Sequence, residues 1–202
     1  MKKSVLIVMS FLCLLTINAV EYNEIYDLSG IKAAVEIKNL IQNDLLKWIN
    51  DDTIIQAVNT ANKKNASRTL DQIKALDKEW INTKEPTSFM KEFTTNRASL
   101  FLIDKMNKSQ MLFAEIFITD FQGCIVAETG ITSDFWQGDE DKFIKTYGAG
   151  GKIFIDKIKY DESTKTSSMQ ISLPLYDMKS KNMVGSITIT LDMDKRSLLK
   201  KK

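Results

Sequence analysis

The last third of the chain alternates apolar and polar residues in successive runs that are separated by short polar links. These runs are residues 152–160, 168–176 and 183–193. A period of two residues predicts strands, and in the last run Ile187, Ile189 and Leu191 would point to one side, toward a core. Short polar links between such runs favour antiparallel hairpins. This part of the chain therefore has to form an antiparallel sheet.

Two more strand-like runs precede these three, at residues 114–119 and 124–129. In the first of them Ile116 and Ile118 alternate with Glu115 and Phe117. The link of residues 120–123, Asp-Phe-Gln-Gly, has the composition of a tight hairpin turn. The sheet is therefore predicted to have five strands.

The first half of the chain has helical periodicity. Apolar residues three or four apart over residues 25–48 predict one long amphipathic helix, interrupted near Gly30. The run of residues 51–53, Asp-Asp-Thr, would cap a second helix, and Pro86 would begin a fourth that runs to about Met106. The third covers residues 70–80. Helices followed by strands with hairpin-length links predict a single α+β domain.

The N-terminus has the layout of a secretory signal peptide. Basic residues at positions 2 and 3 precede an apolar run over residues 5–17, and Ala19 offers a small residue before a cleavage site. The apolar run is shorter than the roughly 20 residues that a transmembrane helix needs. We predict cleavage of residues 1–19, which leaves one periplasmic domain of residues 20–202. The alternative is an uncleaved segment that anchors the protein to the inner membrane.

Composition excludes several classes of function. Without Lys2 and Lys3 the basic residues equal the 26 acidic ones, which gives no reason to expect nucleic-acid binding. The chain has no histidine, which excludes a Ser-His-Asp or Cys-His nucleophile and the usual zinc sites. Cys124 falls within a strand pattern, which is more typical of packing than of catalysis. We predict no enzyme activity, no metal and no cofactor; an enzyme that uses carboxylates alone is the remaining alternative.

Residues 132–143, Thr-Ser-Asp-Phe-Trp-Gln-Gly-Asp-Glu-Asp-Lys-Phe, are polar, acidic and aromatic at once and lie between predicted strands. A Trp in a polar loop is unusual for core packing alone, because its indole N–H needs a partner when it is buried. The stretch therefore suggests a loop that folds over another group. The acids at positions 139–141 also suit the first turn of a short helix over residues 139–147, where the helix dipole favours negative charge.

This stretch, together with residues 115–123, resembles the extracytoplasmic PAS-like sensor family called Cache or PDC domains. It is most similar to small secreted members that carry one such domain and no signalling module. The resemblance covers roughly residues 70–195 and implies a five-stranded antiparallel sheet in the order 2-1-5-4-3, backed by a long N-terminal helix. In the resembling sensors this helix often pairs with its twin, which implies a homodimer; the alternative is that the helix packs only within its own domain. Lys142 stands close to where many sensors of this superfamily carry a ligand-binding Arg, so this chain departs from their pattern there.

Arg97 is a candidate site residue in the fourth predicted helix. It follows Phe93 by four residues and precedes Leu100 by three, which places it on the apolar stripe. A charge that faces a core needs a partner or a route to solvent. Two interpretations are open: Arg97 snorkels or pairs with a structural carboxylate, or its guanidinium receives the carboxylate of a ligand.

We predict a small-molecule-binding sensor domain without its own output module. Its pocket would lie between one face of the sheet and residues 132–147. A small carboxylate is the expected ligand, and a membrane receptor or transport protein is the expected partner. The alternative is a structural or interaction module whose pocket is filled by its own side chains. The predicted site residues would supply aromatic walls, a cation that binds an anionic group, and hydrogen-bonding groups. They are Trp80, Arg97, Asp134, Trp136, Gln137, Lys142 and Tyr147.

Overall fold

The structure is a computed structural model that describes residues 25–162 and 165–201. The chain divides into two compact units, residues 1–32 and residues 33–202. In the described part of the first unit, the carboxylate of Asp27 accepts the backbone N–H of Ser29 at 2.8 Å and stabilises a turn. The predicted signal peptide, residues 1–19, lies outside the described residues.

The helix predicted over residues 25–48 is broken into pieces. The interruption predicted near Gly30 is present, since residues 26–34 are not helical and α2 (Val35–Asn43) begins after them. The predicted continuation to residue 48 is wrong, because Asp44 leaves helical geometry and a short 3₁₀ turn, η1 (Leu45–Lys47), follows. The Asp44 carboxylate accepts the indole N–H of Trp48 at 3.1 Å.

The second and third predicted helices are confirmed as α3 (Asp52–Asn65) and α4 (Leu70–Asn82). Asp51 caps α3 as predicted, because its carboxylate accepts the backbone N–H of Thr53 at 2.8 Å. Thr69 and Gln72 form a capping box at the start of α4, in which each side chain accepts the backbone N–H of the other residue.

The fourth predicted helix is divided in two, α5 (Ser88–Thr95) and α6 (Arg97–Lys108). Asn96 lies between them with an extended backbone, and its Oδ1 accepts the backbone N–H of Ser99 at 2.9 Å. Its Nδ2 donates to the carbonyl of Val126 at 3.0 Å. A single helix through Met106 is therefore wrong, because Asn96 caps α6 and is tied to the sheet.

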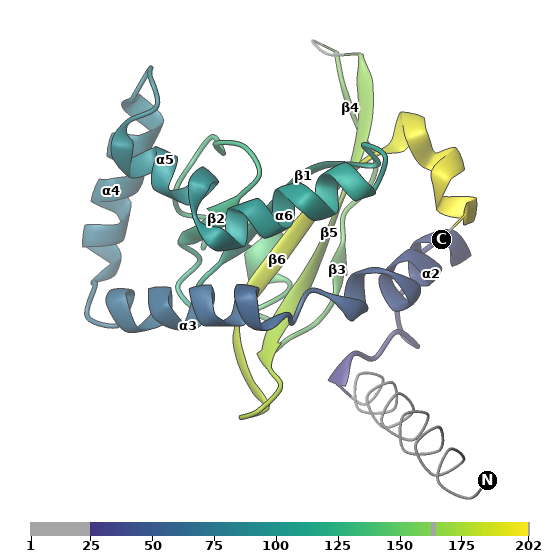
Figure 1. The fold of residues 1–202 in the computed structure, drawn as a ribbon, viewed down its shortest axis with the longest axis horizontal. Helices are drawn as coiled ribbons and strands as arrows, with labels where there is room; N and C mark the ends of the chain where they lie inside the picture. The colour runs from purple at the N-terminus through teal and green to yellow at the C-terminus, as the bar shows by residue number, and fades with distance from the viewer. Residues whose placement is uncertain (1–24, 163–164, 202) are drawn as a thin grey trace, which may run out of the picture. The chain divides into compact units, whose positions relative to one another are not determined.

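The strands form one antiparallel sheet in the order β2-β1-β6-β5-β3 (Figure 1). A further short strand, β4, also pairs with β5, and it shares the third predicted run with β3. The predicted order 2-1-5-4-3 is thus confirmed. The strands are β1 (Phe113–Thr119), β2 (Ile125–Glu128), β3 (Phe154–Ile155), β4 (Lys159–Asp161), β5 (Thr166–Asp177) and β6 (Asn182–Asp192). A short helix, α7 (Asp141–Ile144), lies between β2 and β3, and η2 (Met193–Lys201) follows β6.

The two faces of the central strands differ in chemistry. The apolar face of β1 and β6 carries fully buried isoleucines, among them Ile118 and Ile187. Helices α3 and α6 lie across the sheet (Figure 1). The other face is buried but polar: the hydroxyls of Thr119 and Ser186 are 2.7 Å apart. A buried polar face is an unusual core surface, and its groups need hydrogen-bond partners.

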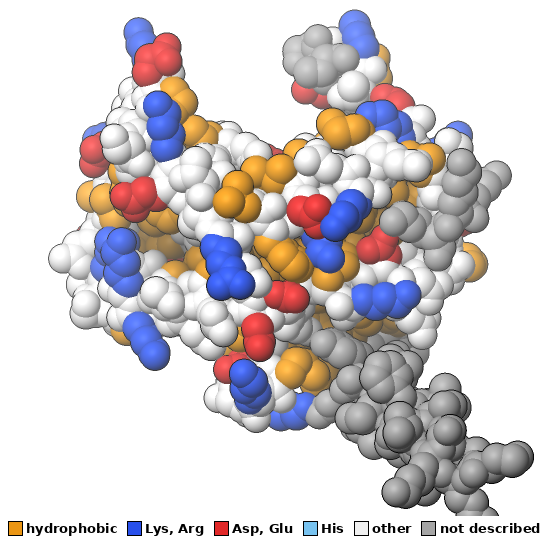
Figure 2. Space-filling view, viewed as in Figure 1, with side chains coloured by type: hydrophobic (Ala, Val, Ile, Leu, Met, Phe, Trp, Pro, Cys, Tyr) orange, Lys and Arg blue, Asp and Glu red, His pale blue; other side chains and the backbone are white. Residues whose placement is uncertain are grey.

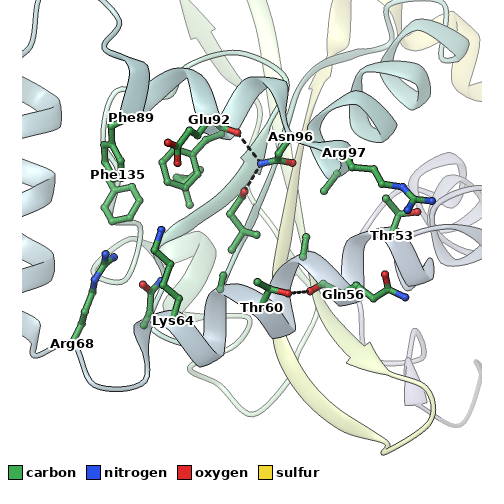
Figure 3. A pocket seen from close by; sticks show the side chains of 17 residues that line it. Thr53, Gln56, Thr60, Lys64, Arg68, Phe89, Glu92, Asn96, Arg97 and Phe135 are labelled. Carbon is green, nitrogen blue, oxygen red and sulfur yellow. Dashed lines mark hydrogen bonds between the residues drawn. The ribbon is translucent and has the colours of Figure 1, made fainter.

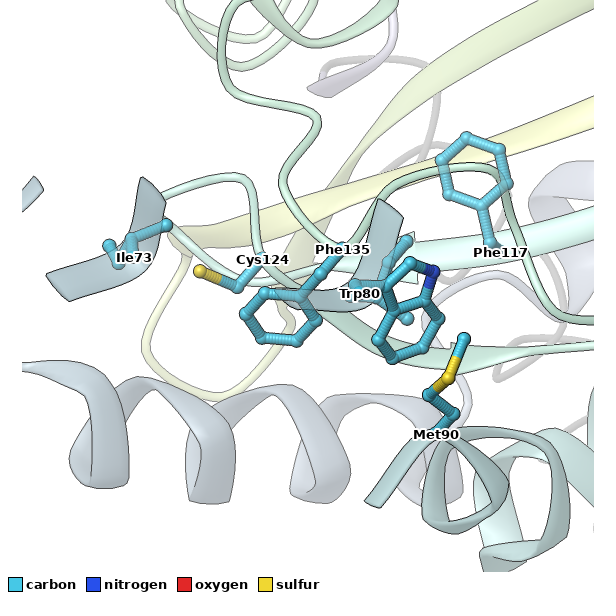
Figure 4. Packing of buried hydrophobic residues seen from close by; sticks show 7 residues of the cluster. Ile73, Trp80, Met90, Phe117, Cys124 and Phe135 are labelled. Atoms are coloured by element: carbon cyan, nitrogen blue, oxygen red, sulfur yellow. The ribbon is translucent and has the colours of Figure 1, made fainter. Parts of the chain in front are cut away.

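A second hydrophobic cluster covers the β2 end of the sheet (Figure 4). Trp80 of α4 lies at its centre, with its ring centroid 5.7 Å from those of Phe93 and Phe135. Cys124 is a free, fully buried cysteine in the same cluster, as expected for a packing residue. Burial raises the pKa of its thiol, which disfavours the reactive thiolate.

Helices across residues 25–162 and 165–201 are all too short or too polar to span a bilayer.

Candidate functional site

The segment that the sequence singles out is tied to β2 by backbone hydrogen bonds. The N–H of Ile125 donates to the carbonyl of Phe135 at 3.0 Å, and the N–H of Gln137 donates to the carbonyl of Gly123 at 2.8 Å. Residues 135–137 therefore pair with the residues at the start of β2 and extend the edge of the sheet by a short antiparallel segment. This pairing fixes the backbone from which the acidic part of the segment projects.

Thr132 anchors the start of the segment. Its hydroxyl and its backbone N–H both donate to Oε2 of Glu128, at 2.8 and 3.1 Å. Its carbonyl accepts the indole N–H of Trp80 at 2.8 Å. Glu128 is fully buried, and burial raises the pKa of its carboxyl to about 7. The segment is thus joined to β2 and to α4 at the same residue.

Trp136 is placed by two hydrogen bonds and a close contact. Its backbone N–H donates to Oδ1 of Asp77 at 2.8 Å, and its indole N–H donates to the carbonyl of Gln122 at 2.8 Å. The indole lies directly against Gly138, where a Cβ would overlap it. The hairpin also approaches closely, since a Cβ on Gly123 would lie 2.6 Å from the Gly138 Cα. These contacts explain why glycine follows Trp136-Gln137.

A polar cleft of about 680 Å³ lies beside this segment. Its walls come from α4, the region of α7, and the edge of the sheet at β3 and β5. The structure brings three predicted site residues together there: Asp134, Trp136 and Lys142. The complete lining is Asp77, Ile81, Asp134, Trp136, Asp139, Glu140, Asp141, Lys142, Phe154, Asp156, Lys157, Lys159 and Gln170.

Carboxylates outnumber ammonium groups in this cleft. Its lysines are Lys142, Lys157 and Lys159, and Lys159 is engaged by Asp156 at 2.7 Å. Burial raises the pKa of Asp77, and the neighbouring carboxylates of Asp134 and Asp139 raise it further. The carboxylates are Asp77, Asp134, Asp139, Glu140, Asp141 and Asp156. The cleft therefore has an excess of negative charge, which favours cationic groups in a bound molecule.

Lys142 connects the cleft to the polar face of the sheet. Its side chain is only 15% exposed, and its Nζ lies 5.3 Å from the ring centroid of Phe117 on β1 and 3.6 Å from Glu140. Burial raises the pKa of the Glu115 carboxyl on the same strand, while the nearby Lys142 charge lowers it. Lys142 is therefore the cation that lies deepest in this part of the molecule.

Three other predicted site residues do not line the cleft. Trp80 is buried in the aromatic cluster described above. Gln137 is buried, and its Nε2 donates to the carbonyl of Asp134 at 2.9 Å while its Oε1 has no described partner. Tyr147 stacks on Phe143 with ring centroids 5.3 Å apart.

Arg97 lies elsewhere. It is exposed at the first position of α6, so its predicted place on an apolar, core-facing stripe is wrong. The break at Asn96 changes the helical frame, so the spacing from Phe93 no longer places Arg97 on the buried face. Arg97 lines a separate groove between α3, α5 and α6 (Figure 3).

Sequence reasoning did not predict the other residues that line the cleft, among them Asp77, Asp156 and Gln170. Asp77 had a signal, because it lies on the stripe of α4 that Ile73 and Trp80 define, where an acid is out of place. Asp156 and Gln170 had no such signal in the sequence. They lie side by side only in the folded sheet, where the N–H of Asp156 donates to the carbonyl of Gln170 at 2.9 Å.

Metal-ligating side chains do not converge within the described ranges. Among those residues there is no group of three or more His, Cys, Asp or Glu placed to hold an ion.

No protein-family model matches the sequence, and no curated protein matches it either. Solved structures to which the chain is similar include ligand-binding or sensor domains of a chemoreceptor and of a histidine kinase. One is the ligand-binding domain of the Pseudomonas aeruginosa PAO1 amino acid chemoreceptor PctC in complex with GABA, at 10% identity and a TM-score of 0.40, covering 70% of this chain and 58% of that one.

The sensor domain of the V. cholerae histidine kinase DctB is 11% identical with a TM-score of 0.41, over 96% of this chain and 59% of that one. The E. coli DcuS sensor domain is 13% identical with a TM-score of 0.36, over 65% of this chain and 94% of that one. This chain spans about three fifths of the PctC and DctB structures. The α+β fold with N-terminal helices and the sheet order β2-β1-β6-β5-β3 is the arrangement that the sequence resemblance implied.

Proposed function

We propose that this protein is a sensor domain that binds a small polar molecule in the cleft beside the segment of residues 132–143. One observation carries the proposal: Asp134, Trp136 and Lys142 come from one short segment and converge on a single cleft of about 680 Å³. That volume lies within the range of small-molecule sites. The sequence resemblance to Cache domains supports the same function.

The charge of the cleft refines the class of ligand. The carboxylate expected from the sequence would have Lys142 and Lys157 as its cationic partners, with Lys142 the less exposed of the two, because Arg97 lines the separate groove and Lys159 is paired with Asp156. The surplus of acids favours a ligand with at least one ammonium group. We therefore propose a small amine or zwitterion, whose carboxylate, when it has one, faces Lys142 and whose amine faces Asp134.

A thermal-shift screen of amines, amino acids and carboxylates, followed by calorimetry, tests this proposal. A ligand at 100 times its Kd adds about 2.7 kcal/mol to the free energy of unfolding. Asp134→Asn should weaken every amine ligand at least tenfold, whereas Lys142→Met should weaken only ligands that carry a carboxylate. Asp104→Asn is the matched control, since Asp104 is exposed on α6 and does not line the cleft. Ligands that bind both cleft variants as tightly as the native protein would refute the assignment.

A second candidate is an interaction module with a self-filled pocket. The observation that favours it is the burial of Trp80, Phe135 and Gln137, which occupy part of the predicted site. This function would be supported over ligand binding if no compound in the screen raised the melting temperature of the folded protein and Trp136→Ala caused a large loss of stability.

We further propose that the protein is exported to the periplasm with cleavage near Ala19. We also propose that it acts through a membrane receptor or transport partner and pairs as a homodimer through its N-terminal helices. N-terminal sequencing of the protein from the periplasmic fraction tests the first point. Light scattering of the purified protein tests the dimer. A retained N-terminus in a membrane fraction would favour the anchored alternative.

A further inference from the structure

A groove of about 400 Å³ runs between α3 on one side and α5 and α6 on the other. It exists because the helix is broken at Asn96, whose side chain bonds to the carbonyl of Val126. Small side chains along both walls, Ala57 and Ala61 on α3 and Ala98 on α6, leave the groove unfilled. In the space-filling view this surface is hollowed, with hydrophobic side chains at the bottom and Lys and Arg at the margins (Figure 2).

The floor of the groove is apolar. It consists of Ile125, Val126 and Phe135, which are buried, and Phe89 and Phe93 of α5 extend it. Phe89 and Phe93 are only half-buried, so a chain of CH₂ groups that covers them removes apolar surface from water and gains free energy.

The rim of the groove is cationic. Its charged residues are Lys64, Arg68 and Arg97 against the single acid Glu92. None of the three cations lies within 4 Å of a described carboxylate. Figure 3 shows Lys64 reaching from α3 toward α5, with Arg68 nearby and Arg97 at the other end. A molecule that matches this groove therefore has an apolar body and an anionic end.

We propose that this groove binds an elongated small-molecule carboxylate of the medium-chain fatty acid class. Its chain lies on the floor of Ile125, Val126 and Phe135, and its carboxylate meets Lys64 and Arg68. Arg97 favours negative charge at the other end of the groove.

This site is distinct from the proposed sensor cleft, because the two linings share no residue. Phe135 of the groove lies between Asp134 and Trp136 of the cleft, so the test variants of the groove are placed on α3 and just after it instead.

Calorimetric titration of the full chain with decanoate, below its micelle concentration, tests the proposal. We expect saturable binding with one site per chain, and at least tenfold weaker binding of acetate, which lacks the chain, and of decylamine, which reverses the charge. Lys64→Gln should weaken decanoate about tenfold. Lys63→Gln is the matched control, because Lys63 is the exposed neighbour on α3 that does not line the groove.

Ala61→Leu places a larger side chain in the groove and should abolish decanoate binding while the protein still unfolds cooperatively. If that variant does not fold, Lys64→Gln and Arg68→Gln decide the question. Three results would each overturn the proposal. The first is no binding at about 100 μM decanoate, and the second is equal affinity for decylamine and decanoate. The third is an equal loss of decanoate affinity in Lys63→Gln and Lys64→Gln.

Discussion

Glu128 holds Thr132 through one carboxylate oxygen. Its Oε2 accepts both the backbone N–H and the hydroxyl of Thr132, whereas its Oε1 has no described partner. The carboxyl is fully buried at the end of β2, so half of its hydrogen-bonding capacity is unused in a place that water does not reach. Ionising such a group costs free energy that two donors only partly offset.

We expect the free energy of unfolding to fall as the pH rises through 7. Burial raises the pKa of Glu128 from 4.5 to about 7, so between these values the native state keeps a proton that the unfolded state releases. This contribution is fully present below pH 4.5 and is lost as the pH rises through about 7, with a total of about 3 kcal/mol. Urea unfolding at a series of pH values measures it.

Glu128→Gln should flatten this dependence, because the amide stays neutral and its oxygen can still accept from Thr132. Part of the slope should remain, since burial also raises the pKa of Glu115. Glu79→Gln, on the exposed side of α4, is the control and should keep the native slope. An unchanged slope in Glu128→Gln would show that Glu128 is not the titrating group.

Gly138→Ala should destabilise the protein by about 1–3 kcal/mol, the range for overpacking. The new Cβ would overlap the Trp136 indole, which then has to leave its bond to the Gln122 carbonyl. Gly130→Ala is the control, because nothing lies within 4 Å of a Cβ there. Denaturant unfolding compares the two, and equal stability would contradict the packing described for Trp136.

Asn65→Ala should cost about 2–3 kcal/mol, since it leaves one oxygen of a buried carboxylate without its donor, while the other oxygen keeps the backbone N–H groups of Gln122 and Cys124. The Nδ2 of Asn65 donates to Oδ2 of Asp120 at 2.6 Å, and Asp120 is fully buried. Asn59→Ala removes a similar bond from the same helix, but to the more exposed Asp177 at 3.3 Å, and should cost less than about 1 kcal/mol. Chemical denaturation of both variants tests whether burial makes the difference.

Cys124 should react with a thiol reagent on the order of a hundredfold more slowly in native protein than in denaturant. The side chain is fully buried, and burial also raises the pKa of the thiol. Stopped-flow labelling of a Cys13→Ser variant measures this thiol alone. Rapid native labelling would indicate that the cluster around Trp80 opens frequently.

The sheet could be predicted from the sequence because its signals are local. Alternation in β6 and the Asp120–Gly123 turn depend on neighbouring residues only, and the capping by Asp51 does too. The strand order came from the family resemblance, since no local pattern specifies which strands pair. The third predicted strand is divided into β3 and β4, which pair with different parts of β5.

The site was predicted in part, for a physical reason. The segment of residues 132–143 was found because its composition is unusual for a loop. Arg97 was misplaced because the break at Asn96 depends on a bond to Val126, a contact thirty residues away. A sequence signal did exist, since Asn is a favoured N-cap residue and two threonines precede it. Asp156 enters the cleft through strand pairing, which composition does not encode.

Trp136 differs from the other two tryptophans in its surroundings. Trp48 and Trp80 are 6% and 3% exposed, whereas the Trp136 indole is half-buried in the wall of the cleft with the Lys74 ammonium 5.4 Å from its ring centroid. The tryptophan fluorescence of the protein therefore comes from two buried indoles and one that contacts solvent. A soluble quencher should reduce mainly the emission of Trp136. The cleft carries its own fluorescent reporter, so its occupancy can be followed without a label.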